Sequence, residues 1–286
     1  MSYSVLTDKK TLDKTALSIR RGIIKAISSN RGGHIGGSMD LADMLAVVYT
    51  DFMRVRPQEP RWDRRDFMIF SKGHAGPALY ATLALNGFFP PDRLEQLNKP
   101  SSLLPGHCDR KIPGVDATTG SLGQGLSIAC GVALGCKLKK TDQRVFCVTG
   151  DGESAEGQIW EAAQFAAHYK LDNLIAFLDW NKKQIDGTND EVLSLGDSVA
   201  KYRSFGWNAY LVKGNDVLAI QNAVARTLDC PNGKPTMIVL GTVKGEGAAC
   251  IMQIKNNHCI GFTNELEQKV LEEFSQKARQ LEQEEN

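Results

Sequence analysis

The feature that most restricts the fold of this chain is an alternation of short apolar runs with amphipathic stretches. Four runs have the length and composition of buried strands: 144–149, 173–178, 210–213 and 236–240. Amphipathic stretches over 158–169 and 216–228 between these runs are typical of helices. Strands that alternate with helices favour a mostly parallel sheet covered on both faces. We therefore predict an α/β fold with three layers, α/β/α.

The N-terminal part of the chain continues this pattern. A single apolar stripe at three- and four-residue steps is formed by Leu12, Ala16, Ile19, Ile23 and Ile27. It predicts a helix over 11–29 that stops at the Asn-Arg-Gly-Gly run 30–33. Further elements are predicted as a strand over 67–70 and helices over 39–51, 77–86 and about 264–282. The absence of repeats or a low-complexity linker makes one domain, 1–286, the simplest organisation.

Composition excludes several classes of function. The 286 residues carry a net charge of +1, which offers no bulk attraction to nucleic acid or to an anionic membrane. No apolar run reaches the roughly 18 residues of a membrane span, and the polar start does not resemble a signal peptide. The seven cysteines include no CxxC pair. Unpaired cysteines without an export signal indicate reduced thiols and a cytoplasmic location.

Two polar side chains follow neighbouring predicted strands. Asp151 ends the first strand within Gly150-Asp151-Gly152, and Asn181 lies just past the end of the next. Right-handed crossovers bring such loops to one edge of a parallel sheet, so the two side chains can converge. Carboxylate and amide oxygens suit Mg²⁺ or Ca²⁺ rather than zinc. The glycines, with a helix starting soon after, favour an anion, so these residues predict a metal-bridged diphosphate.

Gly-Asp-Gly alone is a common turn, so the spacing to Asn181 carries this prediction. The histidines support it independently. Three of the five follow a glycine in a predicted loop: His34, His74 and His107. Loops gathered at one sheet edge would make these imidazoles an active-site cluster. His168 lies late in a predicted helix and is interpreted as structural.

At this point the chain resembles the transketolases. Gly150-Asp151-Gly152 through Asp179-Trp180-Asn181 is similar to the thiamine-diphosphate signature, although the family often has Asn before the second ligand, where this chain has Trp180. Other segments match family motifs in order: Gly33 to Gly37, Ser71 to Ala75, Gly106 to Asp109, Thr119 to Gly125, and Glu153 to Ala162. The resemblance covers roughly residues 11 to 250.

The resemblance implies thiamine diphosphate and Mg²⁺ (or Ca²⁺) as cofactors. It implies Asp151, Asn181 and the backbone carbonyl of Lys183 as metal ligands. It also implies a set of cofactor-binding residues: His74, Gly120, Ser121, Leu122, Gly152, Glu153, Asn181 and Ile185. For Ile185, a core position is an equally open interpretation of its residue type.

The implied reaction is transfer of a two-carbon ketol unit from a ketose phosphate to an aldose phosphate, as in the pentose phosphate pathway. His34 and His107 are expected to contact substrate oxygens. The family's catalytic histidine in a C-terminal loop corresponds to His258, although the residues around His258 depart from the family pattern. Glu156 is expected near a subunit interface, where it would orient a carboxylate of the partner.

Full-length transketolases carry a pyrimidine-binding domain after this region, and its Glu activates the cofactor. That domain does not fit before Asn286. A split enzyme, a truncated piece of a longer protein and a degenerate homologue remain open. Intact motifs and the acidic tail 282–286 favour the split enzyme. We therefore expect an α₂β₂ assembly with a separate C-terminal subunit, containing a homodimer of this chain. The alternatives are a related enzyme acting on an unusual sugar and a non-catalytic subunit that binds thiamine diphosphate.

Overall fold

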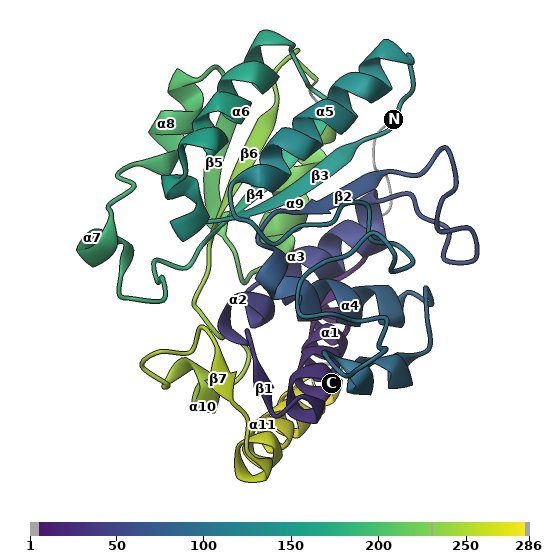
Figure 1. The fold of residues 1–286 in the computed structure, drawn as a ribbon, viewed down its shortest axis with the longest axis vertical. Helices are drawn as coiled ribbons and strands as arrows, with labels where there is room; N and C mark the ends of the chain where they lie inside the picture. The colour runs from purple at the N-terminus through teal and green to yellow at the C-terminus, as the bar shows by residue number, and fades with distance from the viewer. Residues whose placement is uncertain (1–5, 230, 284–286) are drawn as a thin grey trace.

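The centre of the molecule is a five-stranded sheet in which every strand is parallel to its neighbours, in the order β2-β3-β4-β6-β5 (Figure 1). A computed structural model describes residues 6–229 and 231–283. The strands span β2 Phe67–Phe70, β3 Val145–Gly150, β4 Leu174–Trp180, β5 Asn208–Lys213 and β6 Thr236–Gly241. Helices cover both faces of the sheet, which confirms the predicted three-layer α/β/α fold.

The strands are continuous apolar runs because both faces of the sheet are buried. Along β3 the side chains alternate between two separate hydrophobic clusters. Phe146 and Val148 join one cluster, and Val145 and Cys147 join the other. Because both faces of each strand are buried, polar and apolar residues do not alternate along these runs.

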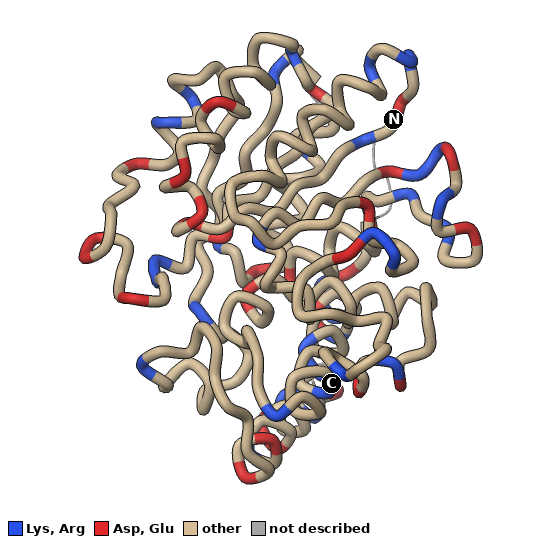
Figure 2. The backbone as a smooth tube through the Cα atoms, viewed as in Figure 1, with Lys and Arg blue, Asp and Glu red and all other residues tan. Residues whose placement is uncertain are grey.

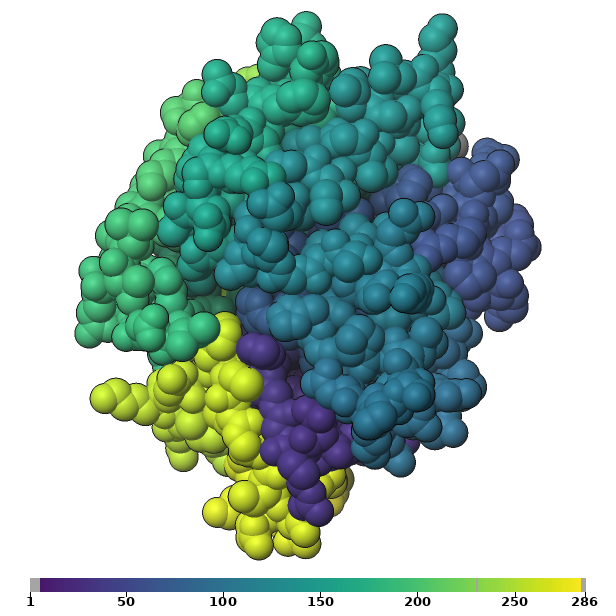
Figure 3. All heavy atoms as spheres, in the orientation of Figure 1, coloured from purple at the N-terminus to yellow at the C-terminus, as the bar shows by residue number. Residues whose placement is uncertain are grey.

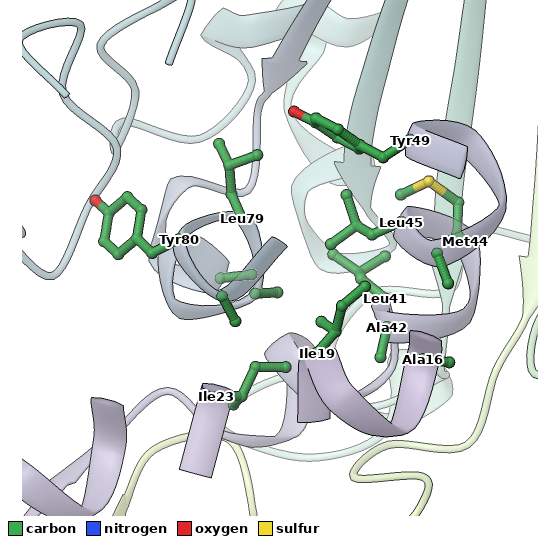
Figure 4. Close-up of a cluster of buried hydrophobic side chains, with 14 of the residues drawn as sticks. Ala16, Ile19, Ile23, Leu41, Ala42, Met44, Leu45, Tyr49, Leu79 and Tyr80 are labelled. Carbon is green, nitrogen blue, oxygen red and sulfur yellow. The ribbon is translucent and has the colours of Figure 1, made fainter. Parts of the chain in front are cut away.

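Two sets of helices supply the outer layers. The first face is covered by α1 Lys9–Ser29, α3 Ala42–Val47, α4 Gly76–Leu85 and α9 Val217–Asp229. The second face is covered by α5 Gln124–Leu138, α6 Gly157–His168 and α8 Ser198–Ser204. Figure 4 shows part of the first layer, with Ile19 of α1 lying close to Leu41.

The terminal helices agree closely with expectation. Helix α1 begins where the Asp8 carboxylate accepts the Thr11 N–H, and its predicted stripe is buried against α3 and α4. Helix α11 covers Asn264–Gln283 and packs on α1 through Val270 and Phe274. The last three residues of the acidic tail, 284–286, lie outside the described residues.

One predicted helix is divided in the structure. Instead of a continuous helix over 39–51, the chain forms α2 Gly36–Met39, then α3, then a π-helical turn, η1 Val48–Phe52. Leu41, with φ −91° and ψ −5°, turns the chain between α2 and α3. The preceding Asp40 is fully buried and bonds to Asn181 and Gly245, far along the chain. Tertiary bonds therefore override the helical pattern here.

Two features were not predicted from the sequence. Helix α5 is rich in Gly, Ala and Cys, which give it little periodic contrast. A two-stranded antiparallel pair joins β1 Gly32–Gly33 to β7 Ile260–Gly261. A Cβ on Gly32, at φ +149°, would lie 2.6 Å from the Ile260 carbonyl oxygen, so glycine allows this approach. Figure 3 shows the result: the N-terminal part (purple) lies beside the C-terminal part (yellow).

The remaining elements are short. They are η2 Gly73–Ala75, η3 Pro91–Gln96, η4 Gly152–Ala155, α7 Asn189–Val192 and α10 Ala249–Met252. Acidic and basic segments are interspersed along the backbone (Figure 2), in keeping with the net charge of +1. The six described cysteines are free thiols, four of them buried. Within residues 6–229 and 231–283, no helix has both the length and the apolarity to cross a bilayer.

Candidate active site

The carboxyl ends of β3, β4 and β6 bring three turns together. Gly150 of β3 is in register with Asp179 of β4, which is in register with Leu240 of β6. The Asp151 N–H donates to the Asp179 carbonyl, which joins the first two turns. The residues that follow each strand therefore meet at one edge of the sheet, as the sequence predicted from the fold class.

Asp151 is buried and held by three donors from its own surroundings. Its Oδ1 accepts the Gly152 N–H at 2.8 Å, and its Oδ2 accepts the Lys182 N–H at 2.6 Å. The amide of Asn189 donates to the same Oδ2 at 2.9 Å. Burial, followed by the nearby Asp179 carboxylate, raises the pKa of Asp151. The side chain is thus fixed in place and lies at a position where a cation would offset its buried charge.

Asn181 is also buried, and both the nitrogen and the oxygen of its amide form hydrogen bonds. The nitrogen donates to Asp40 Oδ2 at 2.9 Å and to Asp179 Oδ2 at 3.2 Å. The oxygen accepts the Lys183 N–H at 3.0 Å. The amide oxygen therefore faces the turn that follows β4 rather than the protein interior.

The backbone carbonyl of Lys183 accepts a hydrogen bond from the ammonium group of Lys244 at 2.7 Å. Lys244 follows β6 in the third turn, and its Nζ also lies 3.1 Å from His258 Nδ1. Burial, followed by the charge of Lys72, lowers the pKa of Lys244. A carbonyl oxygen has two lone pairs, so the Lys183 oxygen can serve a cation as well as Lys244.

Lys72 is a second buried ammonium group at this edge. It forms an ion pair with Asp179, whose carboxylate also accepts a hydrogen bond from Thr242. Burial alone would lower the pKa of Lys72, but the carboxylates of Asp179 and Asp40 outweigh burial and raise it. The ammonium groups of Lys72 and Lys244 are therefore both buried beside the three strand ends.

These donors fit a magnesium-bound diphosphate. The side-chain oxygens of Asp151 and Asn181 and the carbonyl of Lys183 are all hard ligands. No group of three or more His, Cys, Asp or Glu side chains among the described residues could hold a metal by itself. Mg²⁺ is usually bound by one or two carboxylates, with phosphate oxygens and water completing its shell. The chemistry of the donor set therefore matches a metal shared with a phosphorylated ligand.

The structure brings four of the five histidines together. Ring centroids of His34, His74 and His258 lie 5.0 to 5.4 Å apart, and the His107 ring lies 5.9 Å from His34. The β1–β7 pairing carries His34 and His258 to the same place from opposite ends of the chain. His168, by contrast, lies on α6 against Tyr169, away from the cluster.

Burial and neighbouring positive charge keep the inner imidazoles neutral. Burial, then Lys72, lowers the pKa of His74 to about 2. Burial, then Lys244, lowers the pKa of His258 to about 3. Burial also lowers the pKa of His34, with smaller contributions from His107 and Lys244. Neutral imidazoles can both donate and accept hydrogen bonds, which suits contact with hydroxyl and carbonyl oxygens.

The loop over 119–123 lies beside this cluster. A Cβ on Gly120 would lie 3.3 Å from the His107 ring, so the loop backbone packs directly on that imidazole. Ser121 and Leu122 are exposed at the loop tip. The loop is anchored from behind by Glu153, whose carboxylate accepts the Gly123 and Gly150 N–H groups, each at 2.8 Å, and the Ser71 hydroxyl.

Glu153 is buried, so it supports the loop from the protein interior. The other predicted residues lie nearer the surface. Ile185 is 60% exposed, which removes the interpretation of Ile185 as a core residue. Glu156 is exposed before α6, and a Cβ on Gly123 would lie 3.0 Å from its side chain. Gly152 faces Gln184 of the turn after β4.

Several residues of the site were not singled out from the sequence: Asp40, Lys72, Asn189 and Lys244. Two of them carried a usable signal. Lys72 lies within Ser71-Lys72-Gly73-His74, and Lys244 stands before a glycine just after the β6 strand, as Asp151 does after β3. Asp40 and Asn189 gave no such signal, because only their long-range bonds to Asn181 and Asp151 place them here.

Comparisons with known proteins agree on one family. The model of the thiamine diphosphate binding domain of transketolase matches residues 12–277. A 6-deoxy-6-sulfo-D-fructose transketolase subunit of a Clostridium species is 44% identical over 256 residues, with 89% of this chain and 93% of that protein covered. An apulose-4-phosphate transketolase subunit of Phocaeicola vulgatus is 36% identical over 277 residues, with 97% and 98% covered.

Solved structures give the same result for the fold. The transketolase of Campylobacter jejuni superposes with a TM-score of 0.88 at 28% identity, covering 94% of this chain and 43% of that one. Human transketolase is 36% identical, with 93% of this chain and 42% of that protein covered. The chain therefore spans nearly all of the relatives named as subunits and less than half of the long transketolases.

Proposed function

The chain belongs to the transketolase family, and on that premise we propose that it is the thiamine-diphosphate-binding subunit of a split transketolase. The reaction is transfer of a two-carbon ketol unit from a ketose to an aldose. The observation that carries the proposal is the meeting of Asp151, Asn181 and the Lys183 carbonyl with four imidazoles at one sheet edge. Thiamine diphosphate, when bound, supplies the carbanion chemistry that breaks and forms the carbon–carbon bond.

The residues of the chain have separate tasks in this proposal. Asp151, Asn181 and Lys183 hold Mg²⁺, or Ca²⁺ in its place, and the Gly152 N–H, His74 and Gly120 line the diphosphate and ring positions. Ser121, Leu122 and Ile185 cover the cofactor from the exposed side. Glu153 acts indirectly, by fixing the loop that contains Gly123.

The histidines handle the substrate. His34, His107 and His258 hydrogen-bond to hydroxyl and carbonyl oxygens of the sugar and move protons at those oxygens. Burial and the charge of Lys244 lower the pKa of His34 and of His258, so each of these two rings can donate from one nitrogen and accept at the other. A hydrogen bond from one of these imidazoles to the carbonyl oxygen of the sugar would become stronger as negative charge develops on that oxygen. It would therefore stabilise the transition state more than the ground state.

A second chain completes the site in this proposal. The relatives named as transketolase subunits have nearly the length of this chain, which supports a separate C-terminal subunit carrying the pyrimidine-binding domain. Exposed Glu156, beside the cofactor loop, is placed to meet a carboxylate of that subunit. We propose an α₂β₂ assembly in which two copies of this chain pair.

The names of two relatives indicate the class of sugar that the enzyme takes as donor. Relatives named for 6-deoxy-6-sulfo-D-fructose and apulose 4-phosphate support a specialised ketose donor over the common pentose phosphates. Both named sugars carry an anionic group, sulfonate or phosphate. An anionic ketose donor is therefore the class of substrate that we propose.

The test is ketol transfer with thiamine diphosphate and Mg²⁺, using this chain by itself, the complementary chain by itself, and the mixture. Donors are xylulose 5-phosphate, 6-deoxy-6-sulfofructose and apulose 4-phosphate, with ribose 5-phosphate and glyceraldehyde 3-phosphate as acceptors. Activity only in the mixture supports the split enzyme, and the preferred donor defines the substrate. Cofactor binding without turnover of any donor in the mixture would instead support a non-catalytic binding subunit.

A further inference from the structure

The amide nitrogen of Asn181 donates to two carboxylates that come from different parts of the chain. One is Asp179 on β4, and the other is Asp40, 141 residues away, between α2 and α3. Both carboxylates are completely buried. Because an amide nitrogen carries two hydrogens, each carboxylate takes one of them and none remains for another partner.

This arrangement fixes the direction of the Asn181 amide oxygen. If the amide rotated by half a turn, its oxygen would face two carboxylate oxygens with no hydrogen between them, which is strongly unfavourable inside a protein. The oxygen is therefore held on the opposite side, at the turn where it accepts the Lys183 N–H. That is the side on which the metal lies in the proposed function.

The two carboxylates differ in their surroundings. Asp179 is neutralised by the Lys72 ammonium and also bonded by Thr242. Asp40 accepts the Gly245 N–H at 2.6 Å, and across residues 6–229 and 231–283 no basic side chain lies within ion-pair distance of it. Asp40 therefore lies directly behind the Asn181 amide, with one carboxyl oxygen bonded to that amide and the other to the Gly245 N–H.

We propose that Asp40 is a positioning residue for the metal ion. It locks the Asn181 amide with its oxygen outward, toward the metal position, as residues bonded to metal ligands commonly do. Through Gly245 it also fixes the turn that carries Lys244. The inference rests on the proposed function only for the presence of a divalent metal at Asn181.

The test is the substitution Asp40→Asn in the enzyme assembled with its complementary subunit. The new side chain has the same shape but only one acceptor oxygen, so its amide group must face either Gly245 or Asn181. Mg²⁺ is titrated at a fixed, saturating concentration of thiamine diphosphate, and binding is followed by tryptophan fluorescence, which Trp180 beside the site can report. We expect a 10- to 100-fold weaker apparent affinity for Mg²⁺, the usual effect of losing a residue that orients a metal ligand.

A matched control is Asp51→Asn, which removes a carboxylate from the same N-terminal segment. Asp51 bonds to Thr7 and Gln221, away from Asn181, so the Mg²⁺ affinity should stay within about twofold of wild type. If Asp40→Asn does not fold, as judged by circular dichroism, Asp40→Ser takes its place, since a hydroxyl leaves room for water and keeps one hydrogen bond.

A double-mutant cycle separates positioning from general structural support. In an Asn181→Ala background there is no amide to orient, so Asp40→Asn should cost little further Mg²⁺ affinity. An equal loss with and without the Asn181 amide would overturn the proposal, as would an unchanged affinity in a folded Asp40→Asn enzyme. Wild-type binding of thiamine diphosphate without any need for Mg²⁺ would refute the metal site of the proposed function instead.

Discussion

The ammonium group of Lys244 lies 2.7 Å from the backbone carbonyl oxygen of Lys183, the oxygen proposed as a metal ligand. Lys244 follows β6 and Lys183 follows β4, so the contact exists only because those strands are neighbours. It places a buried positive charge beside the position of the metal and of any diphosphate bound to it. We therefore propose that Lys244 is part of the cofactor site, a role that the family resemblance alone did not assign.

Replacing Lys244 with Met should weaken thiamine diphosphate binding at saturating Mg²⁺. A hydrogen bond to a charged group contributes about 1.5–3 kcal/mol, so the dissociation constant should rise by roughly 10- to 100-fold. Isothermal titration of the assembled enzyme measures the change. Lys182→Met, which removes an exposed ammonium one residue before Lys183, is the control and should bind normally. Equal affinities for the two variants would exclude Lys244 from the diphosphate site.

Asp151→Ala should abolish metal-dependent cofactor binding. Asp151 is the carboxylate of the proposed ligand set. It also accepts hydrogen bonds from the Lys182 N–H and the Asn189 amide, which hold the turn after β4. We expect the affinity for thiamine diphosphate in the presence of Mg²⁺ to fall by more than about 100-fold, beyond the loss caused by removing an orienting residue. Equilibrium dialysis with and without EDTA measures it. Binding that persists and still responds to Mg²⁺ would place the metal elsewhere.

His107→Ala should separate chemistry from cofactor binding. The His107 ring lies at the exposed side of the cluster, 5.9 Å from His34, whereas the proposed metal ligands are on other turns. Loss of a group that moves a proton or stabilises an oxyanion costs about 10²- to 10⁴-fold in rate. We therefore expect that loss in kcat/KM with an unchanged dissociation constant for thiamine diphosphate. His168→Ala, on the outer face of α6, should show normal kinetics.

Glu153→Gln should destabilise the fold around the cofactor loop. The carboxylate accepts the N–H groups of Gly123 and Gly150 as well as the Ser71 hydroxyl, and a carboxamide cannot accept at both ends. Leaving a buried donor unpaired costs about 1–3 kcal/mol, which urea denaturation can resolve. Glu161→Gln on the exposed side of α6 is the control. A stability equal to that of wild type would mean that this brace is unimportant.

Acid should destabilise the chain through its buried histidines. Burial and Lys72 lower the pKa of His74 to about 2, below its value of about 6.5 in the unfolded chain. Between these values the unfolded chain binds the extra proton, so stability is lost as the pH falls below about 6.5. One such group contributes a slope of at most about 1.4 kcal/mol per pH unit. His74→Gln should flatten the dependence of the unfolding free energy on pH between 6.5 and 4.5, and a slope equal to that of the wild type would contradict this role of His74.

The sequence was most informative where one residue type serves one local purpose. Apolar runs with two buried faces identified the strands, and the order of strands and helices gave the parallel sheet. The spacing from Asp151 to Asn181 placed both residues just past strand ends, and the parallel pairing of β3 with β4 brings those ends side by side. The Gly-His loops likewise marked three of the four clustered imidazoles, because a parallel sheet gathers such loops at one edge.

Other parts depended on contacts between distant segments. The helix predicted over 39–51 is divided because Asp40 turns inward to bonds at Asn181 and Gly245, which no local pattern encodes. Helix α5 escaped prediction because small residues on all sides give no periodic contrast. His258 joined the cluster through the β1–β7 pairing of the two ends of the chain.

The sequence by itself determined the fold class, the order of the motifs along the chain and the residue types of the site. These follow from the local hydrophobic pattern and from fixed spacing along the chain. The tertiary structure alone decided which groups surround those residues: two buried lysines, the Asp40 and Asp179 carboxylates, and the Asn189 amide. The physical reason is that hydrogen bonds and charge pairs in a buried site depend on distances through space. Residues 38 and 141 positions apart in the chain acquire those distances only when the sheet has formed.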